Sequence, residues 1–274
     1  MADSIPQTDK GKLNYDTIRR LHMKKVQQIN NLYIESQLTV DALSLELKVI
    51  EEKAKASKGR FHVSVPSMRG KDQEISRKYD DVIAMIKGRI KYKEFVQSLV
   101  FAISLTESYI SEIMCLNLVA FPAKLLISIK GNEAVSYQVE MREILNSRSI
   151  EEIVSNKAEQ RVRDALFASP RAYMKYLETV MSFAIPENLM KQFAEIKATR
   201  DVYVHDDGKV NETYLSKSEE AARATLGSKL IVDAQYLSAS VSCMKDIFSA
   251  ILKGMLVKHG ESVEMQRALT ARLI

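Results

Sequence analysis

The chain has 274 residues, of which 46% are hydrophobic and 27% are charged, and its formal net charge is +5. This apolar content can fill a sizeable core, which excludes a largely disordered chain. Only nine glycines and five prolines are present, so the many tight turns of a multistranded β fold are not expected. The composition predicts an all-α protein with long helices and few connections.

Two cysteines, Cys115 and Cys243, lie in apolar, helix-like runs. Such a pair excludes a disulfide framework and indicates buried thiols in a reducing compartment. Residues 1–12 lack the apolar core of a signal peptide. The most hydrophobic region, residues 95–129, is interrupted by charged side chains, so we expect no membrane span and a cytoplasmic location.

The apolar spacing of residues 13–55 predicts two helices, with Thr39 placed to cap the second. Residues 53–71 contain Gly59, Pro66 and Gly70 and are interpreted as a linker. A short strand is expected at Phe61–Val65, where apolar and polar residues alternate.

This pattern divides the chain into an N-terminal helical extension with its linker, residues 1–70, and a helical bundle, residues 71–274. We expect residues 1–55 to pack on the bundle or its partner, because their apolar spacing would be wasted on a free tail.

The bundle is expected to begin with a long helical stretch from Asp72 to about Ala120, ended by Pro122. Shorter helices are expected in the hydrophilic residues 129–160. Proline suits the first turn of a helix, so the Ser169-Pro170 pair predicts the start of another.

Pro186 predicts the start of a helix from Glu187 to about His205. Asp206-Asp207-Gly208 ends it, because two poor helix formers precede a glycine suited to a left-handed turn. A last helix is expected from about Asp233 to His259, with apolar residues on a three- and four-residue spacing.

One face of the helix 187–205 combines apolar residues with an arginine. A guanidinium on a packing face needs a carboxylate, an anion or a partner surface, because burying it alone is very costly. His205 follows five residues after Arg200, about 140° further around an ideal helix. The two side chains can converge if the helix ends at His205 or if two copies of the chain meet here. The residues of this face are Leu189, Phe193, Ile196, Arg200 and Tyr203.

Arg200, four intervening residues and His205 resemble the Arg-x(4–6)-His signature of the HEPN superfamily, in which a polar residue follows the arginine, as Asp201 does here. The resemblance extends over about residues 72–260. Similar segments are Glu195-Ile196-Lys197-Ala198-Thr199, His205-Asp206-Asp207-Gly208-Lys209-Val210, Tyr214-Leu215, the amphipathic Leu105-Thr106-Glu107-Ser108-Tyr109-Ile110 and the closing helix after Ile231-Val232-Asp233.

The resemblance implies a bundle of four to five helices, usually a homodimer in which the two motifs face each other. Active members cleave RNA without metal. Here His205 would transfer a proton, and Arg200 would hold the scissile phosphate. Asp201 would orient one of them, with Glu107 and Tyr203 as supporting residues.

The resemblance implies RNA as the substrate, and no metal or cofactor is expected. A role as a toxin or phage-defence effector follows from the same likeness, with an antitoxin or regulatory protein as a further partner. One subgroup of toxins carries a tyrosine two residues after the motif histidine, as the target of a nucleotidyltransferase antitoxin. This chain has Asp207 there, so that form of regulation is not expected.

The residues around the motif are acidic, and a bound RNA backbone would meet local repulsion unless basic residues converge from elsewhere. Two basic groups occur outside the motif, and each fits either a solvated helix face or a polyanionic partner. They are Lys10, Lys12, Arg19, Arg20, Lys24 and Lys25 in the first group, and Lys87, Arg89, Lys91 and Lys93 in the second.

Other interpretations of the motif remain open. Arg200 can be an arginine at the core edge that pairs with Glu107 or Glu195, with His205 as a polar helix end. The run His205-Asp206-Asp207 can be considered as a metal ligand set, although adjacent residues seldom converge on one ion. A catalytically silent HEPN-like module that binds a partner or a nucleotide is the alternative function.

Overall fold

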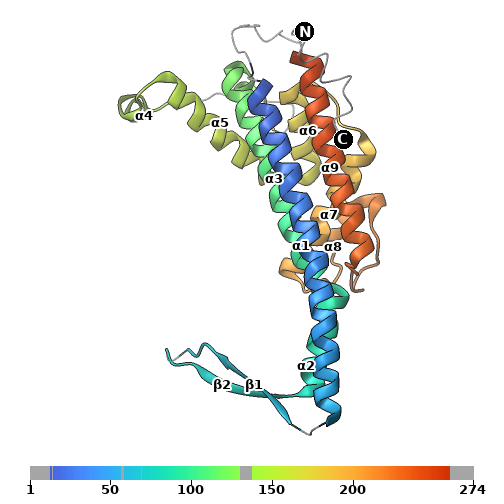
Figure 1. Cartoon of the computed structure of the whole chain (residues 1–274). Coiled ribbons are helices and arrows are strands. Elements are labelled where there is room, and N and C mark those ends of the chain that lie inside the picture. The colour runs from blue at the N-terminus through green and yellow to red at the C-terminus, as the bar shows by residue number, and fades with distance from the viewer. Residues whose placement is uncertain (1–12, 14, 57–58, 69, 130–137, 260–274) are drawn as a thin grey trace.

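The computed structural model describes residues 13, 15–56, 59–68, 70–129 and 138–259 (Figure 1). These residues are mostly helical, which confirms the predicted all-α class. The elements are α1 (Tyr15–Ala56), β1 (Arg60–Val65), β2 (Gln73–Lys78), α2 (Tyr79–Gly88), α3 (Glu94–Ala120), α4 (Met141–Asn146), α5 (Ile150–Leu166), α6 (Pro170–Met181), α7 (Glu187–His205), α8 (Glu212–Ser218) and α9 (Ala234–His259).

The first helix, α1, is a single helix of 42 residues, where the sequence predicts two. That prediction is wrong because no glycine or proline interrupts residues 15–56. The hydroxyl of Thr39 donates a hydrogen bond of 2.8 Å to the carbonyl of Glu35 inside the helix, so it does not act as a cap. At about 1.5 Å per residue, α1 is about 63 Å long and extends well beyond the bundle (Figure 1).

A β-hairpin follows α1 and projects from the far end of the molecule (Figure 1). The predicted strand at Phe61–Val65 is confirmed as part of β1, which pairs antiparallel with β2. The expected start of a helix at Asp72 is wrong, because residues 73–78 form this second strand and the helix begins at Tyr79. Cross-strand hydrogen bonds to β1, about twelve residues away, decide the conformation of β2.

A continuous helical run from residue 79 to residue 120 consists of α2, the π-helical turn η1 (Arg89–Lys93) and α3. It ends before Pro122, as predicted. Among the described residues this run alone is apolar and long enough, by length and composition, to cross a membrane. In this structure α3 is also a core helix with many buried residues, so the expected absence of a membrane span stays a prediction.

The remaining predicted helix boundaries agree closely with the structure. Ser169 caps α6 by accepting a hydrogen bond from the amide of Ala172 at 3.3 Å. The hydrophilic region 129–160 contains α4 and the start of α5, and its residues 130–137 lie outside the described part, as do Lys10 and Lys12. Cys243 is buried and Cys115 half-buried, both as free thiols, and burial raises the pKa of each.

The core forms around α3, α6, α7 and α9, and α1 packs against α3 and α9. Ile18 and Ile29 of α1 belong to the same buried cluster as the residues of α3 and α9. Helix α7 lies at the centre of the bundle, because it contacts α3, α6, α8 and α9. The domain boundary expected near residue 70 stays a prediction. Helix α1, on the N-terminal side of that boundary, contributes buried residues to the core of the bundle.

Removing a buried side chain from α1 should therefore destabilise the whole bundle. Ile29 is fully buried, whereas Ile34 on the same helix is 53% exposed. We expect Ile29→Ala to lower the free energy of unfolding by about 2–5 kcal/mol, and Ile34→Ala by less than about 0.5 kcal/mol. Chemical denaturation measures both, and equal small effects would show that α1 does not pack on the bundle.

Candidate functional site

The candidate site is built on the last turn of α7, which ends as the sequence predicts. The amides of Asp206 and Gly208 both donate to the carbonyl of Val202, at 2.8 and 3.1 Å. Asp207 and Gly208 have positive φ angles of 48° and 79°. A Cβ on Gly208 would lie 2.8 Å from the ring of Tyr203. The left-handed backbone and this close ring contact both require glycine here.

Two carboxylates hold Arg200 at the edge of the core, where 22% of its side chain is exposed. Its Nη2 lies 3.2 Å from an oxygen of Glu107 on α3, and its Nη1 lies 3.1 Å from an oxygen of Asp201. Its Nε is buried and has no hydrogen-bond partner among the described residues. Of the two carboxylates considered from the sequence, Glu107 pairs with Arg200, whereas Glu195 pairs elsewhere.

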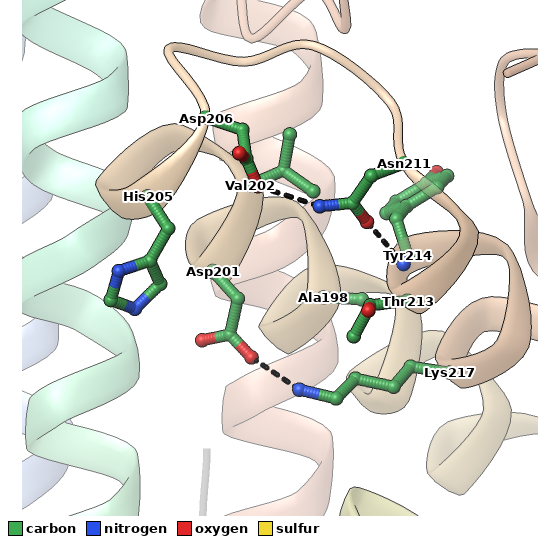
Figure 2. Close-up of a pocket in the computed structure, with 9 residues that line it drawn as sticks. All are labelled: Ala198, Asp201, Val202, His205, Asp206, Asn211, Thr213, Tyr214 and Lys217. Atoms are coloured by element: carbon green, nitrogen blue, oxygen red, sulfur yellow. Dashed lines mark hydrogen bonds and ion pairs between the residues drawn. The ribbon is translucent and has the colours of Figure 1, made fainter. Parts of the chain in front are cut away.

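His205 is the last residue of α7 and its side chain is exposed to solvent. It borders an open hollow between α7 and α8 (Figure 2). In Figure 2, Asp201 lies between His205 and Lys217, and one of its oxygens accepts a hydrogen bond of 2.9 Å from the lysine Nζ. The hollow is lined by Ala198, Asp201, Val202, His205, Asp206, Asn211, Thr213, Tyr214 and Lys217.

The loop after α7 is held in place by Asn211. Its side-chain nitrogen donates a hydrogen bond of 2.6 Å to Asp206, and its side-chain oxygen accepts one of 2.8 Å from the amide of Tyr214. Asn211 thus caps α8 while it anchors the end of α7. The hollow that His205 borders therefore has a defined shape on its α8 side.

Within one chain, Arg200 and His205 do not face the same space. Arg200 turns toward Glu107 on α3, and it is not among the residues that line the hollow beside His205. Because α7 continues as one helix through both residues, they remain about 140° apart around its axis. Asp201 is the link between them, since it pairs with Arg200 and lines the hollow.

Tyr203 is not among the residues that line the hollow. Its hydroxyl donates a hydrogen bond of 2.5 Å to the carbonyl of Leu230. Burial raises the pKa of Tyr203, with smaller effects from the charges of Arg223 and Asp207 and from nearby Tyr92. This geometry gives the tyrosine a packing role next to the site, without a contact to the hollow.

Sequence reasoning missed Lys197, which belongs to the same ion-pair group. It is buried, and its Nζ lies 2.7 Å from the second oxygen of Glu107. One carboxylate on α3 therefore serves two cations, Lys197 and Arg200, that lie three residues apart on α7. The three-residue spacing of these cations was a usable signal, because it places both on neighbouring positions of one helix face.

A second buried group surrounds Glu195, which is only 4% exposed. One of its oxygens accepts hydrogen bonds from Thr199, Tyr214 and Arg223, and the other accepts one from Tyr236, all between 2.7 and 2.9 Å. The guanidinium of Arg223 also lies over the ring of Tyr236, at 3.6 Å from its centroid. This network joins α7, α8 and α9, and one of its members, Tyr214, also lines the hollow beside His205.

No group of three or more His, Cys, Asp or Glu side chains within the described ranges is arranged to hold a metal ion. Comparisons with protein-family models, with curated proteins and with solved structures found no match to this chain. The likeness to the HEPN superfamily therefore depends on residues 200–205 and on the similar segments around them.

The Glu195 network should stabilise the fold. Replacing Glu195 by alanine leaves Arg223 and two tyrosine hydroxyls without their acceptor. We expect Glu195→Ala to lower the free energy of unfolding by about 3–5 kcal/mol. The matched control is Glu187→Ala on the same helix, where the side chain is 71% exposed and pairs with Lys191 at the surface. Urea denaturation compares the two, and similar losses would contradict a structural role for the network.

Proposed function

We propose that this chain is a metal-independent endoribonuclease of the HEPN type that acts as a homodimer. The observation that carries the proposal is the C-terminal end of α7. There the exposed His205 borders a hollow that is also lined by Asp201, the ion-pair partner of the partly exposed Arg200. Histidine transfers protons near neutral pH, and a guanidinium binds phosphate by two parallel hydrogen bonds. These are the two groups that phosphodiester cleavage by an internal hydroxyl requires.

In the proposed reaction, the RNA's own 2′-oxygen attacks the adjacent phosphorus and the bond from phosphorus to the 5′-oxygen breaks. The products are a 2′,3′-cyclic phosphate and a 5′-hydroxyl. A base takes the proton of the 2′-hydroxyl and an acid gives one to the departing 5′-oxygen. Arg200 stabilises the negative charge that develops on the phosphate oxygens.

A second copy of the chain would supply what one copy lacks. Arg200 and His205 point to different sides of α7, so a single chain does not assemble them around one phosphate. Residues Phe193–Thr199 of α7 are almost wholly enclosed by the chain itself. Near the motif, the dimer contact would therefore use the C-terminal end of α7, which includes the exposed Val204.

The pairing of Arg200 favours one alternative, a catalytically silent interaction module. Two carboxylates already occupy the guanidinium, at 3.2 and 3.1 Å, and the hollow beside His205 is lined by further acidic groups. A guanidinium has five N–H donors, however, and two contacts leave donors for a phosphate. We therefore favour the enzyme. A negative cleavage assay would support the catalytically silent module instead.

The first test is RNA cleavage in the presence of a metal chelator. Wild-type protein should cleave, and His205→Ala should lower the rate by about 10²–10⁴, because it removes the proton-transfer group. Arg200→Lys should also lower the rate, since an ammonium cannot reproduce the planar contact with two phosphate oxygens. Both variants should keep the melting temperature of the wild type, because Arg200→Lys retains the positive charge that Glu107 requires and His205 is exposed.

The matched control is Arg171→Lys, which changes an arginine with a 78% exposed side chain that pairs with Glu219 on the surface. It should cleave like the wild type. Activity that survives His205→Ala, or that requires added magnesium or manganese, would contradict the proposed mechanism. Absence of cleavage by every form, with Arg200→Ala lowering the melting temperature, would instead support the silent module.

The second test asks whether the site is shared between two chains. Arg200→Ala and His205→Ala should each be inactive alone. After the two are mixed and allowed to exchange subunits, we expect about a quarter of the wild-type activity, because half of the dimers are mixed and each carries one complete site. Mixing without any gain, in a protein shown by light scattering to be dimeric, would place both residues of each site in one chain.

A further inference from the structure

The positive charge of the chain is concentrated in one segment, residues 53–93, which we call the basic arm. This segment contains twelve lysines and arginines and four aspartates and glutamates, a surplus of eight positive charges. The whole chain has a surplus of only five, so the remainder is slightly acidic. The basic arm comprises the end of α1, the hairpin β1–β2, α2 and η1, and it lies at the end of the molecule opposite the end of α9 (Figure 1).

The hairpin of the basic arm has both faces open to solvent. Five of the six residues of β1 are exposed, and so are four of the six residues of β2. An isolated two-stranded hairpin is only marginally stable in water. In the register of the two strands, Phe61 lies opposite Arg77 and Val63 lies opposite Ile75, so these four side chains share one face. That face combines an exposed aromatic ring with a guanidinium and apolar neighbours.

Some cations of the basic arm have structural partners. Arg60 donates hydrogen bonds to the hydroxyl and the carbonyl of Ser76 across the hairpin. Lys87 lies 2.8 Å from Glu51, which joins α2 to α1, and Arg89 lies 2.8 Å from Glu94. In the described part of the chain, no ion pair involves four further exposed cations. They are Arg77, Lys78, Lys91 and Lys93.

The basic arm joins the bundle beside the candidate site. The turn η1 is followed directly by α3, which packs against α7. The charge of Tyr92 on η1 also contributes, after burial and the charges of Arg223 and Asp207, to the shifted pKa of Tyr203 on α7. Tyr203 lies two residues before His205. The hollow beside His205 is lined by Asp201 and Asp206, and Lys217 is the lysine among its lining residues. A polyanion that reaches this hollow needs positive charge from elsewhere, and the nearby basic arm offers it.

We propose that the basic arm binds single-stranded RNA and guides it to the last turn of α7. This inference deepens the proposed function, and it rests on that function for the fate of the RNA. Arg77, Lys78, Lys91 and Lys93 contact phosphates, and the ring of Phe61 stacks on a base beside Arg77.

Single-stranded RNA fits this surface better than a duplex does. The deep, narrow major groove of A-form RNA does not admit side chains that read it, whereas unstacked bases bind to aromatic rings and guanidinium planes. An open strand face with a phenylalanine next to an arginine supplies such a platform. The unpaired lysines of η1 continue the positive surface from the hairpin toward α7.

The test measures binding separately from cleavage. The probe is a short, unstructured 2′-O-methyl RNA, which lacks the hydroxyl nucleophile and cannot be cut by the proposed mechanism. Fluorescence anisotropy gives its affinity for the full chain over a range of salt concentrations. Two double variants, Arg77→Glu with Lys78→Glu and Lys91→Glu with Lys93→Glu, should each weaken binding at least about tenfold. Each should reduce the slope of log affinity against log salt by about 1.4.

Phe61→Ala should weaken binding by about tenfold while leaving the salt slope unchanged, because it removes a stacking contact and no charge. The matched control is Arg142→Glu with Lys253→Glu, which makes the same change of net charge on exposed residues of α4 and α9. It should change the affinity by less than about threefold. The pair at Lys91 and Lys93 lies on a helical turn, so it tests the arm without relying on the hairpin's stability.

Affinity that falls equally in the control and in the arm variants would overturn the proposal. So would arm variants that bind the probe like the wild type, or wild-type protein that binds vesicles of phosphatidylcholine and phosphatidylserine but not the probe. Probe binding lost only in the arm variants, together with no cleavage of natural RNA by any form, would support the arm and refute the proposed function. Normal cleavage with normal probe binding by the arm variants would refute the arm alone.

Discussion

The buried charges of α7 are the constraint on which the rest of the structure depends. Glu195 and Lys197 lie in the middle of a helix that its own chain encloses, at 4% and 7% exposed. A charge in such a place needs a partner, because leaving it unpaired costs several kcal/mol of free energy. Glu107 of α3 pairs with Lys197, and Arg223 with two tyrosines satisfies Glu195. These contacts fix α3, α8 and α9 around α7.

The same constraint determines what the candidate site can be. With its middle enclosed, α7 exposes side chains only toward its two ends, and its C-terminal end carries Arg200 and His205. Glu107 extends the core ion pair to Arg200, while Asp201 connects the arginine to the hollow beside His205. The arginine is therefore held in place from within the fold, and the histidine is free to meet a ligand. In the arrangement that we propose, a dimer contact at this end of α7 brings both groups together, and the basic arm guides RNA to them.

Local signals in the sequence predicted where α7 begins and ends. They did not predict contacts between residues that are far apart in the sequence. Pro186 and the run Asp206-Asp207-Gly208 mark its ends by their own backbone preferences, and both ends are confirmed. Whether residues 73–78 form a strand depends on a partner strand, so a helix was wrongly expected there. The spacing of Arg200 and His205 revealed a candidate site. It left Glu107 and Glu195 as alternative partners of the arginine. Only the packing of α3 on α7 shows that Glu107, 93 residues earlier in the chain, is the one that pairs with it.

The central claim is that His205 and Arg200, near the C-terminal end of α7, cleave RNA through its own 2′-hydroxyl. Mass spectrometry of the ends of the RNA fragments tests this most directly. After digestion of a defined RNA by the wild-type protein in excess chelator, the account predicts a 2′,3′-cyclic phosphate on the upstream fragment and a 5′-hydroxyl on the downstream fragment. A 3′-hydroxyl with a 5′-phosphate would show that water attacks the phosphorus, and would contradict the account.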